Sequence, residues 1–320
     1  MEPILSICIP TYNRSGFLKQ ALDSIVSQPV FIESNDIEVV VCDNCSTDDT
    51  SQQIKPYLEK YKNKIIYIRN SENILDKNFS KVLSLGSGQF LKLMNDTLII
   101  KDGSLTEILN VVKKALDEKP VLFFANGNSK QKKRISSFPS FEEFFKNASF
   151  HVTWIGSFGI WRSDYERIND FNRASNLNLI QVDVLFRLFE WNKKSVIDNN
   201  IYFISITPPK KGGYDLITVF ADNYFQLLKV PVTRGDLSIK SYNREKKKML
   251  VKFFIPWLIR CEVEHDKYHF GITDWGKRLQ RYYTGVFRFY LIYFKFMKFC
   301  YKIYYLLYKK KKTTAVVTGG

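Results

Sequence analysis

The sequence of 320 residues has few cysteines and histidines and lacks a glycine-rich phosphate-binding loop. Its 5 cysteines are too few for a disulfide scaffold, and 3 histidines with a single C-x-x-C pair, Cys42 and Cys45, disfavour a zinc or redox site. Neither G-x-G-x-x-G nor G-x-x-x-x-G-K-[ST] occurs, which disfavours a dinucleotide fold and a P-loop. No charge-free stretch is long enough to span a bilayer, and no apolar run follows a basic N-terminal cluster. We therefore expect a cytoplasmic protein without a transmembrane helix or signal peptide.

Basic and aromatic residues are in excess. Lys and Arg number 48 against 32 Asp and Glu, a formal net charge of +16, which predicts an anionic partner. Aromatic residues make up 15% of the chain, and both excesses concentrate after residue 246. We predict a compact domain over residues 1–235, a basic and aromatic helical region over 236–312, and a disordered tail over 313–320.

Short apolar segments alternate with segments of helical periodicity along the first 125 residues. We predict strands over 5–9, 37–42, 64–68, 89–94 and 121–125, and helices over 17–26, 78–85 and 104–118. This alternation is typical of βαβ units, so we predict an α/β fold with a mixed, mainly parallel sheet flanked by helices. Ligands of such sheets bind beyond the carboxyl ends of the strands.

Three polar clusters follow predicted strands, at residues 11–14 (TYNR), 43–46 (DNCS) and 95–97 (NDT). Each alone is compatible with turn and capping residues, but three at one sheet edge favour a nucleotide site built from side chains. The carboxylate of Asp43 can accept a hydrogen bond from a base, and the ring of Tyr12 can stack on one. A carboxylate at Asp96 can hold a divalent cation against a diphosphate.

Four motifs in sequence order carry a resemblance to a known family. LSICIPTYNR, VVVCDNCSTDDT, RNSENILDKN and FLKLMNDTLIIKDGSL resemble family 2 glycosyltransferases of the GT-A fold, in particular the abequosyltransferase-like bacterial enzymes that build cell-surface polysaccharides. The resemblance covers roughly residues 4–235 and implies a Rossmann-like catalytic domain over 1–235. It implies inverting transfer of a sugar from a nucleotide diphosphate sugar, by our expectation a UDP-sugar, to a hydroxyl of a lipid-linked or cell-surface glycan.

The resemblance also assigns donor-site residues position by position. Asp43 matches the aspartate that reads the uracil ring, and Lys77 stands where the family faces the diphosphate, in place of a more usual arginine. The full set expected at the donor is Pro10, Thr11, Tyr12, Asn13, Asp43, Asn73, Lys77, Asn95 and Asp96.

The metal-binding D-x-D segment of the family falls at residues 95–97, where Asp96 is the one acid. A single carboxylate together with substrate phosphates can hold Mg²⁺, so we expect Mg²⁺ or Mn²⁺ at Asp96. The alternative is that Lys77 and other basic groups neutralise the diphosphate without a metal.

An inverting transferase needs a carboxylate that takes the proton of the acceptor hydroxyl. The resemblance places this base at Asp183, where the family's acidic pair is reduced to one carboxylate, and Arg187 at i+4 is spaced to pair with it. The alternative for Asp183 is a favourable charge near a helix N-terminus. His151, Trp154 and Arg187 are candidates for the acceptor pocket; packing is the alternative for His151, in an aromatic strand, and for Trp154.

Residues 281–312 are predicted to form a basic and aromatic helix on an anionic membrane surface, at the inner face of the cell membrane. Its cations recur on one stripe: Arg281, Arg288, Lys295, Lys298, Lys302 and Lys309. Packing against the catalytic domain and self-association are the alternatives, and the lack of a nucleic-acid-binding motif disfavours nucleic acid.

Two classes of function follow from these residues. The first is the glycosyltransferase, favoured by Asp43 and Asp183. The second is a non-catalytic nucleotide- or glycan-binding protein of the same fold, favoured by the neutral Asn95 and Thr97 in the metal segment.

Overall fold

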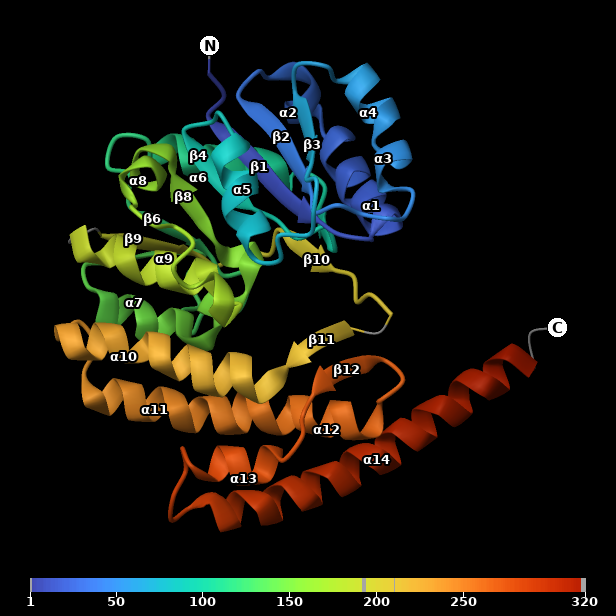
Figure 1. Ribbon diagram of the computed structural model, residues 1–320, viewed down its shortest axis with the longest axis vertical. Coiled ribbons are helices and arrows are strands. Elements are labelled where there is room, and N and C mark those ends of the chain that lie inside the picture. The colour runs from blue at the N-terminus through green and yellow to red at the C-terminus, as the bar shows by residue number, and fades with distance from the viewer. Residues whose placement is uncertain (1, 192–193, 210, 318–320) are drawn as a thin grey trace. The chain divides into compact units, whose positions relative to one another are not determined.

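The computed structural model describes residues 2–191, 194–209 and 211–317, with the backbone alone for 308–317. The chain divides into two compact units (Figure 1). Unit 1 comprises Met1–Thr207 and Lys229–Ser241, and unit 2 comprises Pro208–Leu228 and Tyr242–Gly320. The predicted domain boundary at residue 235 therefore falls inside the second segment of unit 1.

Unit 1 is built on a five-stranded sheet in the order β3-β2-β1-β4-β8. Its strands are β1 (Leu5–Thr11), β2 (Ile37–Asp43), β3 (Ile65–Arg69), β4 (Phe90–Leu93) and β8 (Gly159–Trp161). The first four pair in parallel, and β8 runs antiparallel to β4. The prediction of a mixed, mainly parallel α/β sheet is confirmed.

Both faces of this sheet are covered by helices. Helix α5 (Lys77–Leu85) packs on one face, in front of β1 in Figure 1. Helices α1 (Ser15–Val26) and α6 (Ser104–Lys114) share the main apolar core on the other face. Every residue of β2 is buried, as expected for an inner parallel strand, which explains why it reads as a continuous apolar run.

The predicted strand at 121–125 forms, but in another sheet. Strand β6 (Val121–Phe124) pairs in parallel with β9 (Ser195–Asp198), which pairs antiparallel with β7 (Ile135–Phe138). The place beside β4 is taken by β8 instead, so the sequence prediction of β6 as the fifth strand of the main sheet is wrong.

The remaining elements of unit 1 are α2 (Pro29–Glu33), α3 (Thr50–Gln53), α4 (Lys55–Lys60), β5 (Leu98–Ile100) paired with β10 (Phe203–Ser205), α7 (Phe141–Ala148), α8 (Arg162–Arg167) and α9 (Ile180–Leu188).

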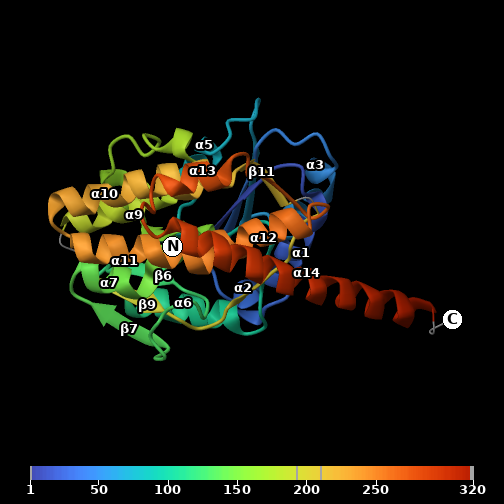
Figure 2. The ribbon, with the colours of Figure 1, turned by 90° about the horizontal axis from the view of Figure 1, so that it is seen from below.

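Unit 2 is mainly helical. It contains the parallel pair β11 (Lys211–Asp215) and β12 (Tyr268–Gly271), and the helices α12 (Ile255–Val263), α13 (Trp275–Gln280) and α14 (Phe287–Val317). Helices α10 (Tyr224–Arg234) and α11 (Ile239–Met249) each have residues in both units. Helix α14 packs against α12, and Figure 2 shows its C-terminal half continuing past α12. Among the described residues, no helix has both the length and the apolar character needed to cross a bilayer.

The long C-terminal helix begins later than predicted. Residues 281–286 form turns, and Gly285 has a left-handed backbone with φ of +82°. Such a backbone interrupts a helix at low cost only at glycine, so α14 starts at Phe287. It extends to Val317, into the range 313–320 for which a disordered tail is predicted; residues 318–320 lie outside the described residues.

Candidate active site

The carboxyl ends of neighbouring strands bring the three predicted polar clusters together. Thr11 at the end of β1 lies in register with Asp43 at the end of β2, and Asp96 follows β4. The Thr11 hydroxyl donates a hydrogen bond to Asp96 Oδ2 at 2.9 Å, and the Asn13 backbone N–H donates to Ser46 Oγ at 2.8 Å. Side chains from all three clusters therefore meet at one edge of the sheet, where ligands of parallel sheets bind.

Asp43 is fully buried at this edge. Its carboxylate accepts hydrogen bonds from the Ser46 backbone N–H at 2.9 Å and the Tyr67 hydroxyl at 2.8 Å, and Arg69 Nε lies 3.6 Å away. Burial and the hydrogen bond to Asp43 raise the pKa of Tyr67, which keeps that hydroxyl protonated as a donor. A base can reach Asp43 only after Arg69 or Tyr67 turns aside, and the Arg69 side chain, at 44% exposed, has room to do so.

Asparagine side chains hold the loop between β3 and α5. The Asn44 amide donates to Asn73 Oδ1 at 2.7 Å, and its carbonyl oxygen accepts from the Ile74 backbone N–H at 2.9 Å. The Asn70 amide bridges Asn44 Oδ1 at 3.1 Å and Asn78 Oδ1 at 2.9 Å. Asn44 belongs to one of the three predicted clusters, whereas Asn70 and Asn78 were not expected at the site, because asparagine is equally common in turns.

Asp96 is 2% exposed, and protein donors occupy both of its oxygens. Besides Thr11 on Oδ2, Arg14 Nη1 donates to Oδ1 at 3.2 Å. Burial raises the pKa of Asp96, and the nearby Arg14 and Thr11 oppose that shift. The Arg14 side chain is 46% exposed, so the pair joins a buried carboxylate to a cation at the surface.

Other expected donor residues lie on the open side of this edge. Tyr12 is 42% exposed, and Asn13 and Asn73 are exposed. Lys77, at the start of α5, is also exposed. Pro10 and Asn95 are half-buried. Unlike Asp43 and Asp96, the side chains of Tyr12, Asn13 and Lys77 are therefore accessible from solvent.

The two cysteines of the C-x-x-C pair differ in burial, since Cys42 is buried and Cys45 is half-buried. Cys42 and Cys45 are both free thiols. Burial raises the pKa of the Cys42 thiol to about 11, which makes it unreactive near neutral pH. In the part of the chain that the structure describes, no group of three or more His, Cys, Asp or Glu residues is arranged to hold a metal ion.

Asp183 lies in the first turn of α9 and is held by two arginines. Arg173 Nε donates to its two oxygens at 3.1 and 2.9 Å, and Arg173 Nη2 donates to Oδ1 at 2.7 Å. Arg187 Nη1 lies 3.5 Å from Oδ2, at the i+4 spacing that the sequence predicts. The hydrogen bonds to Asp183 raise the pKa of Arg173. Arg173 was missed because no periodic spacing links it to Asp183.

One contact connects the segment before α9 with the asparagine-held loop. Asn178 hydrogen-bonds Asp76, the residue before α5; burial raises the pKa of Asp76 and this hydrogen bond opposes the shift. Among the described residues, no hydrogen bond joins Asp183 to the residues at the strand ends. The predicted base and the predicted donor residues are thus connected indirectly, through the contact between the segment before α9 and the loop before α5.

The predicted acceptor residues His151 and Trp154 do not lie on a strand. His151 is within a 3₁₀ helix (Ser149–Thr153), which corrects its expected place in an aromatic strand. It is half-buried beside the Phe150 ring, with ring centroids 4.5 Å apart. Trp154 is half-buried and packs edge-on against Phe203. Gln181 Nε2 donates to the Thr153 carbonyl at 2.9 Å, which ties this segment to α9.

The predicted membrane cations do not all share one helix. Arg281 precedes α14 and lies 3.9 Å from Asp222, so its expected place on the helical stripe is wrong. Lys298 forms an ion pair with Glu262 on α12. Arg288, Lys295 and Lys302 are exposed, and the side chain of Lys309 lies outside the described residues.

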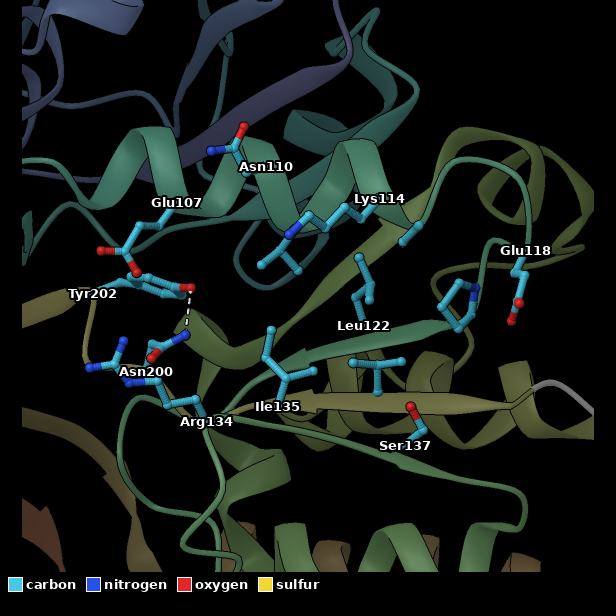
Figure 3. Close-up of a pocket in the computed structure, with 14 residues that line it drawn as sticks. Glu107, Asn110, Lys114, Glu118, Leu122, Arg134, Ile135, Ser137, Asn200 and Tyr202 are labelled. Atoms are coloured by element: carbon cyan, nitrogen blue, oxygen red, sulfur yellow. Dashed lines mark hydrogen bonds between the residues drawn. The ribbon is translucent and has the colours of Figure 1, made fainter.

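A cavity of about 520 Å³ lies elsewhere in unit 1, between α6 and the sheet of β6, β9 and β7. Figure 3 shows Tyr202 and Asn200 on one side of it, joined by a hydrogen bond of 3.0 Å, and Ile135 nearby. None of the donor or base residues predicted from the sequence lines this cavity. The strand-end cluster, with its charged groups and exposed aromatic ring, is the better candidate for the active site.

A family model described as glycosyl transferase family 2 matches residues 6–174, more than half of the chain. The chain belongs to this family. The matched range contains Thr11, Asp43 and Asp96, and the expected resemblance is confirmed. Unit 1 has the architecture expected of this family, so the predicted GT-A fold is confirmed.

Individual relatives match over shorter stretches or at lower identity. Over 101 residues the chain is 41% identical to abequosyltransferase RfbV of Salmonella typhimurium. The matched stretch is 31% of this chain and 30% of that protein. Staphylococcus aureus TarS 1-349 in complex with UDP superposes with a TM-score of 0.50 at 16% identity, covering 80% of this chain and 71% of that one. Mannosyltransferase PcManGT from Pyrobaculum calidifontis, in complex with GDP-Man and Mn²⁺, gives 0.54 at 16% identity, covering 78% and 71%.

The residues at 95–97 do not form a fitting site for a divalent cation. Asp96 is the one carboxylate there, and Thr11 and Arg14 already donate to both of its oxygens. A metal ion beside Asp96 would also face the positive charge of Arg14. Mg²⁺ or Mn²⁺ at Asp96 therefore remains a prediction from the sequence. The side chains around Asp96 do not support it.

Proposed function

We propose that this glycosyltransferase moves a sugar, with inversion, from a UDP-sugar to a hydroxyl of a lipid-linked or cell-surface glycan. The observation that carries the proposal is the meeting of Thr11, Asp43 and Asp96 at the carboxyl ends of adjacent strands. Side chains, not a glycine-rich backbone loop, surround the nucleotide there. Tyr12 stacks on the base, and Asp43 accepts a hydrogen bond from uracil once Arg69 turns away.

Asp183 is the general base of the proposed reaction. It takes the proton from the acceptor hydroxyl while the hydroxyl oxygen attacks the anomeric carbon, and the bond between that carbon and the diphosphate breaks. The electron pair of the broken bond leaves on the diphosphate oxygen. Arg173, whose side chain is 44% exposed, must release part of its contact so that an acceptor can reach Asp183. Arg187 helps to hold the carboxylate in place.

Helix α14 supports a membrane-bound acceptor. Its exposed apolar side chains recur every three or four residues: Phe289, Ile292, Phe296, Phe299, Ile303 and Leu306. The opposite face is used inside unit 2, where Phe287 and Phe294 are buried and Tyr301 hydrogen-bonds Glu264. Among the described residues of unit 2, no side chain covers this exposed stripe.

Charge identifies the partner that fits this stripe. Arg288, Lys295 and Lys302 are exposed beside it, and residues 287–317 contain no Asp or Glu. The spacing of the apolar stripe resembles a coiled-coil seam. A second copy of the helix would, however, bring these cations close to one another, and like charges repel. Anionic lipid at the inner face of the cell membrane complements both the cations and the aromatic stripe. His151 and Trp154 then contribute to binding the glycan part of the acceptor.

A thermal-shift screen of sugar nucleotides, with and without Mn²⁺, tests the donor class. We expect uridine nucleotides to raise the melting temperature and guanosine and thymidine nucleotides not to do so. Stabilisation by GDP-mannose instead would contradict the role of Asp43 as a uracil reader. Stabilisation by no nucleotide would contradict the proposed reaction.

A non-catalytic binding protein of the same fold is the second candidate. The observation in its favour is that arginines occupy the predicted base while the metal segment holds one carboxylate. Such a protein would bind UDP-sugars without releasing UDP. Measured UDP release from a stabilising UDP-sugar, with a membrane fraction as the source of acceptor, separates the two candidates.

A further inference from the structure

The pair of Arg14 and Asp96 occupies the part of the active site where family members place a metal ion. Arg14 follows β1 directly after Tyr12 and Asn13, and its guanidinium reaches back to a carboxylate beyond β4. A carboxylate as buried as Asp96 is costly to ionise without a partner. Arg14 is the cation within ion-pair distance of it among the described residues.

We propose that Arg14, held by Asp96, supplies the positive charge that this enzyme sets against the diphosphate of its donor, in place of a divalent metal ion. This inference rests on the proposed function, since it concerns the same nucleotide site. As the anomeric C–O bond breaks, its electron pair adds one negative charge to the departing diphosphate. A cation fixed before the reaction stabilises that charge without reorganisation.

The geometry of Arg14 suits this role. One of its N–H groups is used by Asp96, while a guanidinium carries five donors in a planar fork that matches phosphate oxygens. Its side chain is 46% exposed, which leaves room for a ligand to reach the donors that Asp96 does not use. Asp96, fixed by Thr11, sets the direction of the guanidinium.

Neighbouring groups complete the charge balance. Arg69, at the end of β3, and Lys77, at the start of α5, are exposed cations on either side of the loop that the asparagine side chains hold. Arg69 is committed to Asp43, and Lys77 lies at the start of α5. Arg14 differs from both because its carboxylate partner, Asp96, is the acid of the metal segment itself.

Calorimetric binding of UDP and of uridine to the full chain, in EDTA and in Mn²⁺, tests the inference. We expect wild type to bind UDP with equal affinity in both. Arg14→Gln should weaken UDP binding by about tenfold or more and leave uridine binding unchanged, because uridine has no phosphate. Arg14→Lys, which keeps a charge beside Asp96, should lose less. Lys19→Gln, an exposed cation on α1, is the matched control and should bind like wild type.

Four results overturn or redirect the inference. UDP binding that requires Mn²⁺, or Arg14→Gln binding UDP as wild type does in EDTA, overturns it. If GDP binds in place of UDP, the uridine assignment fails while the same comparison made with GDP and guanosine still decides the role of Arg14. If no nucleotide binds wild type, the proposed function and this inference both fall.

Discussion

The guanidinium of Arg173 donates three hydrogen bonds to the carboxylate of Asp183, so the predicted base is oriented from outside its own helix. A carboxylate held by several hydrogen bonds has a fixed direction. An acceptor hydroxyl has to compete with Arg173 for the same oxygens. This relationship makes Asp183 the first residue to test.

Asp183→Asn should lower the rate of UDP release by at least about 100-fold, because an amide cannot take the proton of the hydroxyl. The affinity for UDP, measured by calorimetry, should not change. Asp170→Asn is a matched control, because the contact of Arg187 with residue 170 uses the backbone carbonyl. Wild-type turnover in Asp183→Asn would remove Asp183 from the reaction.

Asp43→Asn should weaken the binding of uridine by about tenfold, because the carboxylate that accepts from the base is lost. Tyr67→Phe removes one donor to Asp43 and keeps the carboxylate, so we expect a much smaller loss. Calorimetry with uridine measures both variants. Equal affinities for wild type and Asp43→Asn would show that the base lies elsewhere.

Lys92 makes the stability of the fold depend on pH. Its ammonium group is fully buried and donates to the carbonyls of Leu93, Gly156 and Phe158. Burial lowers the pKa of Lys92 from 10.5 to about 7. Between these values the unfolded chain binds a proton that the folded chain does not, so stability rises as the pH rises above about 7.

From pH 7 to pH 9 this linkage should add about 2 kcal/mol to the free energy of unfolding. Urea unfolding at several pH values measures the slope, which Lys92→Met should remove. Lys114→Met, at an exposed position of α6, should keep it. A slope that persists in Lys92→Met would assign the effect to another group.

Replacing Phe289 and Phe296 by Ser should weaken binding to anionic vesicles by about 100-fold or more, since each buried Phe contributes about 1.5–3 kcal/mol. Sedimentation with phosphatidylglycerol vesicles measures this, and phosphatidylcholine vesicles should bind wild type poorly. Ile32→Ser, at an exposed apolar position of α2 in unit 1, is the control. Unchanged binding of the double variant would separate α14 from the membrane, and a change in oligomeric state instead would identify the stripe as a contact between copies.

The sequence predicts the β/α alternation up to α6 closely, because each of these elements has its own local apolar period. It does not predict β8, a three-residue strand whose pairing with β4 joins residues far apart in the chain. It also misses the start of α14, because a composition that favours a helix continues through the turn at Gly285. Pairing and interruption depend on tertiary context that local patterns do not contain.

The same distinction between local pattern and tertiary context applies to the residues of the candidate active site. The rule that ligands bind at strand ends locates Thr11, Asp43 and Asp96, which meet as expected. The pairings of Arg14 with Asp96 and Arg173 with Asp183 are set by the fold, and no spacing in the sequence indicates either. The sequence identifies the two carboxylates, and the structure identifies the arginine that pairs with each of them.

The loop that follows β3 is fastened by the amides of Asn44, Asn70 and Asn78. Amides carry no titratable proton near neutral pH, so acidification leaves these bonds intact. A loss of turnover in mild acid would accordingly report on carboxylates such as Asp76 and Asp96, whose pKa values burial raises, and not on the amide bonds of this loop.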